Sequence, residues 1–148
     1  MFPLIVIAAS TSVIRLVGFL FGIPWLDGWV PAVTGGLAIM FALMAVAHFA
    51  QPRRDALIAM VPPRLPRAAT LVTVTGVLEL AGAVGLVIPS TSRLAAICLG
   101  LLLIVMFPAN VHAARAQTGI RTMPLPTRAL VQVVFLAACA IVAIAPAI

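Results

Sequence analysis

The sequence predicts an all-α membrane protein: a bundle of four transmembrane helices preceded by one additional N-terminal transmembrane helix. The 148 residues are 64% hydrophobic and only 8% charged, whereas soluble domains are about 25% charged. Several apolar runs also reach the ~20 residues that a helix needs to cross a bilayer. We therefore expect a single transmembrane domain whose first partner is the lipid bilayer.

The predicted spans cover residues 2–22, 31–50, 68–89, 93–114 and 128–148. The first span lacks a basic start and a small-residue cleavage site, so we expect a retained helix rather than a cleaved signal peptide. Trp25 and Trp29 follow it, as in the aromatic belt of a membrane interface. Tight turns or proline-rich stretches separate the later spans.

Residues 51–67 do not have the composition of an ordinary linker. Leu57, Ile58 and Met60 are too apolar for free exposure, and the pair Pro62-Pro63 ends any helix that begins before it. We expect a short interfacial or re-entrant helix in this segment. A membrane-surface loop without function is the alternative.

The basic residues, all of them arginine, predict the orientation of the chain. Seven of the nine lie in residues 51–67 and 115–128, two segments that face the same side if there are five spans, and the loops of the opposite side carry only Arg93. The positive-inside rule then places the N-terminus in the cytoplasm and the C-terminus outside. The net charge of +6 does not indicate a nucleic-acid partner, because the arginines flank apolar spans.

Glu79 interrupts the run Leu71–Pro89, which is otherwise apolar, small or hydroxyl-bearing. A carboxylate at the centre of a transmembrane helix costs about 2.5–3.5 kcal/mol on insertion scales, so it indicates a functional site. Thr75, Gly76 and Ala83 lie near it at helical spacing, which directs the acid toward other helices. An interhelical hydrogen bond without further function is the alternative.

Arg15 is the first candidate partner of Glu79. Counted at 1.5 Å per residue from the cytoplasmic side, Glu79 lies roughly 16 Å deep and Arg15 roughly 20 Å deep. Two opposite charges at matched depth predict an ion pair, because either charge alone in hydrocarbon is unfavourable. If the first and third spans are not neighbours, Glu79 must instead contact His48, Asn110 or water.

Further polar residues gather at the predicted cytoplasmic ends of the helices. Pro108 also frees a backbone carbonyl at a similar level. Together with Glu79, these residues predict a ligand-binding pocket that extends from the cytoplasmic face to mid-bilayer; they are His48, Asn110, His112 and Gln132. Interfacial histidines satisfied by headgroups and water are the alternative for His48 and His112.

Metal and thiol chemistry are not expected at these positions. His48, Glu79 and His112 are suitable ligand types, but they lie on separate helices without a metal-binding spacing. Cys98 and Cys139 are far apart in the sequence, and each lies within an apolar predicted span. We therefore expect them to be packing residues.

Several short motifs occur in an order and spacing that resembles the DoxX family of small bacterial membrane proteins, in its DoxX-like branch. They are Ala47-His48-Phe49, Met60 to Pro66, Thr75 to Ala83, Pro89 with Thr91 to Ala96, and Phe107-Pro108-Ala109-Asn110. The resemblance covers roughly residues 31–147. It implies a four-helix bundle in a bacterial inner membrane. It implies nothing for Arg15, because the first span is an addition to that bundle.

Members of the DoxX family are linked to thiosulfate:quinone oxidoreductase subunits and to a membrane complex that joins a superoxide dismutase and a sulfurtransferase. The resemblance therefore implies a quinone or another lipophilic ligand, and a partner redox enzyme or a homo-oligomer. The sequence carries no redox-cofactor motif, so we expect a binding or anchoring subunit rather than a self-contained enzyme.

Two other functions remain open from the sequence. Glu79 is also suited to a small proton-coupled transporter or exporter, although inverted repeats are not evident. The polar residues are equally suited to a structural scaffold in which they set the register of the helices.

Overall fold

The computed structural model describes residues 2–115 and 124–145, and this part of the chain consists of helices without a β-strand. The six helices are α1 (Phe2–Leu20), α2 (Trp29–Ala47), α3 (Arg53–Met60), α4 (Ala68–Val87), α5 (Ser92–Arg115) and α6 (Leu125–Ile144). All but α3 are long and apolar enough to cross a membrane. The predicted all-α fold is confirmed, and its composition is compatible with a membrane protein.

The predicted spans differ from the helices by a few residues at their ends. The first helix ends at Leu20 because Gly22 takes a left-handed φ of 61° and the Ile23 N–H bonds the Gly18 carbonyl at 2.8 Å. The last helix begins at Leu125 rather than Arg128, since a proline fits the first turn of a helix. Residues 146–148 of the predicted fifth span lie outside the described residues.

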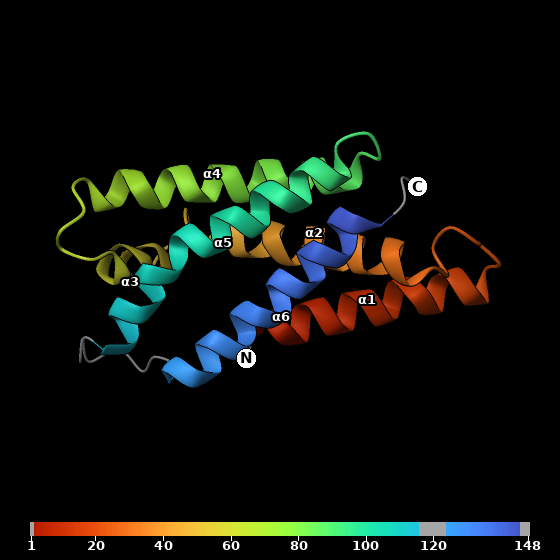
Figure 1. Ribbon diagram of the computed structural model, residues 1–148, viewed down its shortest axis with the longest axis horizontal. Helices are drawn as coiled ribbons and strands as arrows, with labels where there is room; N and C mark the ends of the chain where they lie inside the picture. Colours follow the sequence, from red (N-terminus) through yellow and green to blue (C-terminus); the bar gives the residue numbers. More distant parts are fainter. Residues whose placement is uncertain (1, 116–123, 146–148) are drawn as a thin grey trace.

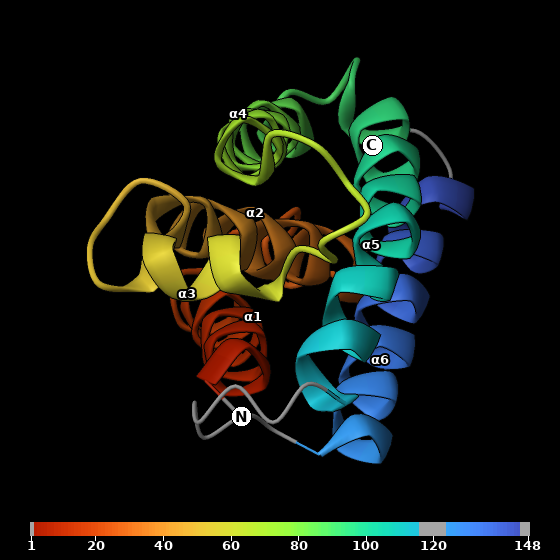
Figure 2. The same ribbon diagram turned by 90° about the vertical axis from the view of Figure 1, so that its left-hand side faces the viewer.

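Helix α2 is the centre of the bundle. It packs against α1 on one side and α4 on the other, while α5 and α6 pair with each other and contact α4 and α2 respectively. Figure 2 shows α4, α2 and α1 as one group of helices beside the α5–α6 pair. The bundle of four is therefore α2, α4, α5 and α6, with α1 added against α2, as the sequence predicts.

Helix α3 is the short helix expected within residues 51–67. It lies at one end of the bundle against α4 and α5 (Figure 1), and we call this the α3 end. Arg54 attaches it to the bundle by donating to the His48 carbonyl at 2.6 Å and to Thr73 Oγ1 at 3.0 Å. The guanidinium of Arg53 lies 5.8 Å from the ring centre of Phe2, at the start of α1.

Small residues allow the helices to approach closely. A Cβ atom added at Gly36 of α2 would lie against Thr11 and 3.3 Å from the Ile7 carbonyl of α1. At Gly76 of α4 it would lie 2.5 Å from His48 Cβ. Close contacts of this kind are the main source of helix association where lipid removes the hydrophobic driving force.

The core is concentrated in the half of the bundle away from α3. Its largest fully buried side chains are Leu37, Met40 and Phe41 of α2, Leu86 of α4 and Leu99 of α5. Cys139 and Val142 of α6 join the same cluster. Large apolar side chains such as Leu16, Val84 and Val105 are exposed on the outside. This distribution suits a protein surrounded by lipid.

Gly76→Ala should destabilise the protein. The added methyl group would overlap His48 Cβ, which is fixed to the α2 backbone and cannot rotate away, so α2 and α4 must separate. Overpacking of this kind costs about 1–3 kcal/mol. We expect a lower midpoint when loss of the monodisperse protein in mild detergent is followed by heating and size-exclusion chromatography.

Gly100→Ala is the matched control. Its added Cβ would lie 3.7 Å from Cys139 Cβ, an ordinary contact distance, and alanine is favoured over glycine inside a helix by about 0.5–1 kcal/mol. A midpoint for Gly76→Ala equal to or above that of Gly100→Ala would contradict the packing described for α2 and α4.

Candidate functional site

Glu79 lies inside the bundle beside His48. The acid comes from the middle of α4, and His48 is the residue that ends α2. They are 5% and 4% exposed. Glu79 Oε2 lies 3.4 Å from His48 Nε2 and has no hydrogen-bond partner within the described parts of the chain. The carboxyl group of Glu79 therefore lies against the imidazole of His48 and can still accept hydrogen bonds from other groups.

The imidazole of His48 is held from its other side. Its Nδ1 lies 2.8 Å from the Val72 carbonyl and 3.2 Å from Thr75 Oγ1. Gly76 provides the space for the ring, since a side chain there would overlap it. A carbonyl oxygen only accepts, so we assign the hydrogen to Nδ1 and direct Nε2 at Glu79.

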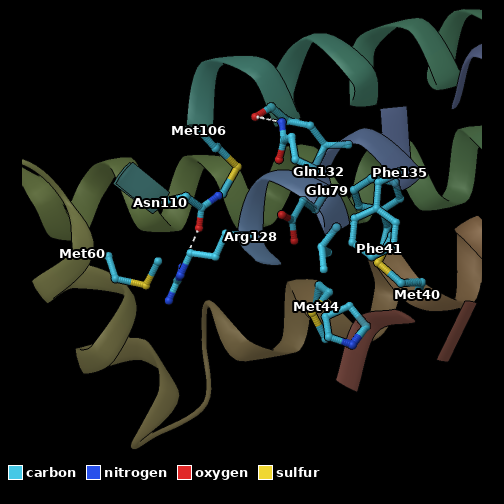
Figure 3. Close-up of a pocket in the computed structure, with 13 residues that line it drawn as sticks. Met40, Phe41, Met44, Met60, Glu79, Met106, Asn110, Arg128, Gln132 and Phe135 are labelled. Atoms are coloured by element: carbon cyan, nitrogen blue, oxygen red, sulfur yellow. Dashed lines mark hydrogen bonds between the residues drawn. The ribbon is translucent and has the colours of Figure 1, made fainter. Parts of the chain in front are cut away.

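Glu79 also lines a cavity of about 460 Å³ in the half of the bundle nearer α3. Every helix contributes to its wall, which is mainly apolar (Figure 3). The lining residues are Pro3, Met40, Phe41, Met44, Met60, Glu79, Leu103, Met106, Asn110, Arg128, Val131, Gln132 and Phe135. The volume falls within the roughly 300–1,000 Å³ of typical ligand sites.

Two amides bring further polar groups to this cavity. Gln132 of α6 donates from Nε2 to the Leu103 carbonyl of α5 at 2.7 Å. Asn110 of α5 accepts at Oδ1 from the guanidinium of Arg128 at 2.9 Å. Figure 3 shows Asn110 with Arg128 on the side of the cavity toward Met60, and Gln132 and Glu79 farther from Met60. The cavity thus has two separate polar regions joined by apolar walls.

Comparison with known proteins identifies a family. The profile of a domain of unknown function, DUF8561, matches residues 37–146. The chain belongs to the DUF8561 family. The match begins within α2, and it includes His48 and every cavity-lining residue except Pro3. No curated protein and no solved structure matches the chain. The DUF8561 region is thus the four-helix bundle with α3, and α1 lies outside it.

Three of the five residues predicted to bind a ligand line one DUF8561 cavity, and a fourth supports it. Glu79, Asn110 and Gln132 face the cavity, and His48 contacts Glu79 from behind. His112 lies elsewhere, in a shallow hollow with Pro62, Pro63 and Arg64 at the α3 end. His112 follows Asn110 by two residues in the same helix, and side chains two residues apart point to different faces of a helix.

The predicted ion pair between Arg15 and Glu79 is not formed. Arg15 instead donates to Asp27 Oδ1 at 3.0 Å, and its guanidinium lies 4.2 Å from the ring centre of Trp29. Depth alone does not determine the partner, because α1 packs against α2 whereas α4 lies on the other side of α2. The loop after α1 folds back over Gly18, and this places Asp27 within reach. The alternative of a Glu79–His48 contact is the one observed.

The sequence reasoning did not identify Arg128 or the methionines as cavity residues. Met40 and Met44 are four residues apart on α2, a spacing that places both on one helix face. Methionines at this spacing are common in ordinary cores, so sequence alone does not distinguish a cavity wall. The arginine was assigned to a membrane-flanking role, whereas its guanidinium bonds Asn110.

A double-mutant cycle should show that Arg15 couples to Asp27 and not to Glu79. The Arg15 and Asp27 side chains are 28% and 41% exposed, so we expect a coupling of only about 0.2–1 kcal/mol. The variants are Arg15→Gln, Asp27→Asn, Glu79→Gln and the two pairs containing Arg15→Gln. Unfolding free energies in detergent provide the readout. Effects of Arg15→Gln and Glu79→Gln that depart from additivity by more than about 0.5 kcal/mol would contradict the observed pairing.

Replacing His48 should be costly only while Glu79 is present. His48→Leu leaves a buried carboxylate without a partner, a change that typically costs about 3–5 kcal/mol. In the double variant His48→Leu with Glu79→Leu, both polar groups are gone, and the unfolding free energy should return to within about 1 kcal/mol of the native protein. A double variant whose loss equals the sum of the two single losses is the result that excludes this description.

Proposed function

We propose that this DUF8561 chain is an integral membrane subunit of DoxX-like type that binds a quinone or another lipophilic molecule beside Glu79, in support of redox or thiol homeostasis. One observation carries the proposal. Glu79 lines an apolar cavity, and among the described residues its carboxyl group contacts His48 at 3.4 Å without forming a hydrogen bond. Buried carboxyl groups are nearly always hydrogen-bonded, so this one supports a ligand or water at the cavity wall.

The wall of the cavity suits a lipophilic ligand. Met40, Met44, Met60 and Met106 provide four flexible thioether side chains, which adapt to irregular apolar shapes. Phe41 and Phe135 add flat apolar surfaces. Few polar groups interrupt this lining, and those few lie at opposite regions of the cavity. A ligand with an apolar body and one or two polar atoms fits this pattern.

The polar residues divide into two roles under this proposal. His48 and Glu79 hold and exchange a proton next to the ligand, because an imidazole and a carboxyl group lie in direct contact. Asn110 retains an amide N–H group to donate to a ligand carbonyl, since its oxygen is bonded to Arg128. None of these groups supplies electrons, so the chain acts as a binding subunit and its partner enzyme supplies any redox step.

We further propose that the α3 end faces the bacterial cytoplasm. Arg53, Arg54 and Arg64 lie at this end, and the opposite end has Arg93 and the Arg15–Asp27 pair. The predicted contribution of Arg121 falls outside the described residues. With this orientation the cavity lies in the cytoplasmic half of the bundle, and the N-terminus is cytoplasmic. A partner enzyme or a second copy of the chain docks at this end or on the lipid-facing helices.

The packed half of the bundle favours a binding site over a transport path. Leu37, Leu86 and Leu99 are almost completely buried on the side of Glu79 away from α3. A transporter uses the same buried acid, but its solute must also reach the opposite side of the membrane. The cavity and the buried side chains between it and the opposite end therefore support a ligand site rather than a continuous path.

Glu79→Gln should reduce the amount of lipophilic ligand that co-purifies with the protein. The substitution preserves the shape of the side chain but removes the charge and its contact with His48. We expect a loss of about tenfold or more, because hydrogen bonds to charged groups contribute about 1.5–3 kcal/mol. Purification in a gentle detergent followed by mass spectrometry of the extracted small molecules provides the measurement.

Asp27→Asn is the matched control for this experiment. It is the same chemical change in an acidic residue that contacts Arg15 and does not line the cavity. Its extract should resemble that of the native protein. If Glu79→Gln expresses normally and retains the same co-purifying molecules and the same oxidant sensitivity of the cells, the proposed function is wrong.

A further inference from the structure

The orientation of the Gln132 side chain is settled by its partner. Its amide lies 2.7 Å from the Leu103 carbonyl, which can only accept a hydrogen bond. The NH₂ group must therefore face Leu103, and Oε1 is the atom left for the cavity. At this position Gln132 offers the cavity an acceptor.

The contact with His48 likewise determines which oxygen of the Glu79 carboxyl group remains for a ligand. His48 Nδ1 faces the Val72 carbonyl and bears a hydrogen, so Nε2 faces Glu79 Oε2 at 3.4 Å. Oε2 is therefore directed at His48, and the other carboxyl oxygen of Glu79 is the one left to accept a hydrogen bond from a ligand.

These two acceptors face the same region of the cavity. Both residues line it, and Figure 3 shows them apart from the Asn110–Arg128 pair. Gln132 is 9% exposed, so its amide is mostly surrounded by other residues. Two acceptors that lack a donor are unfavourable in an apolar setting. The region is therefore incomplete without a hydrogen-bond donor.

We infer that the ligand carries a hydroxyl group on an apolar body and that this hydroxyl donates to Glu79 and Gln132. The inference rests on the proposed function and narrows its ligand class. For a quinone-type ligand it means preference for the reduced, hydroxyl-bearing form over the oxidised form. A carbonyl at the same position would meet two acceptors and leave all three oxygens unsatisfied, a situation that strongly disfavours binding.

The test compares ligands that differ only in this donor. The first pair is para-nonylphenol and its methyl ether, which share an aromatic body and do not exchange electrons with the protein. The second pair is dodecanol and its methyl ether, which tests an aliphatic hydroxyl. Binding to the full chain in one nonionic detergent is followed by calorimetric titration. We expect at least one hydroxyl compound to bind about tenfold or more tighter than its ether.

Variants identify the acceptors and correct for partitioning into micelles. Gln132→Met keeps the side-chain length but removes the oxygen, and it should lower the preference for the hydroxyl severalfold. Cys98→Ser, an exposed residue of α5 that does not line the cavity, should keep the preference. Because all proteins are titrated at the same detergent concentration, differences between them do not arise from the micelles.

The outcomes separate this inference from the proposed function. Binding of hydroxyl and ether compounds with equal affinity overturns the inference and leaves the lipophile site intact. A hydroxyl preference that survives in both Gln132→Met and Glu79→Gln also overturns it, because other groups would then accept the hydrogen bond. If none of the compounds binds, the proposed function fails and this inference fails with it. Preference in only one pair identifies the hydroxyl as aromatic or aliphatic.

Discussion

The contact between His48 and Glu79 is the constraint on which the rest of the arrangement depends. A carboxyl group in the middle of an apolar helix needs a partner, and here the partner is His48, the C-cap residue that follows α2. That requirement sets how α2 and α4 pack, because the imidazole occupies the space that Gly76 leaves open. Arg54 of α3 donates a hydrogen bond to the His48 carbonyl, and this contact positions α3 beside the end of α2. One buried polar contact thus organises three helices and the closed side of the cavity.

Most of the fold follows from the sequence because apolar length and punctuation are strong signals for membrane-type helices. The five long helices and the short α3 are found where the sequence predicts them, with small shifts at their ends. The shifts come from local chemistry that hydropathy ignores, such as the left-handed Gly22 and the proline in the first turn of α6. Single-residue effects of this kind move a helix end without changing the number of helices.

The candidate site was predicted less completely. Residue type and depth grouped Glu79, His48, Asn110 and Gln132, and the structure places three of them at one cavity with His48 behind Glu79. Depth alone does not show which helices are neighbours, so it favours a pair between Arg15 and Glu79. In the structure α1 packs against α2, and Arg15 contacts Asp27 in the loop that follows α1. The rotation of each helix was also unknown. This is why His112 was grouped with residues on another face and Arg128 was overlooked.

The close helix contacts and the cavity wall have different tolerances for substitution. Gly36 and Gly76 lie where α2 contacts α1 and α4, and a larger side chain at either position would overlap the neighbouring helix. The cavity wall contains flexible methionine side chains, so substitution of Met44, Met60 or Met106 mainly alters the shape of the space. Changes at these positions therefore alter the interior space of the bundle while the close helix contacts stay constant. A chain with this arrangement can vary its interior without a change of fold.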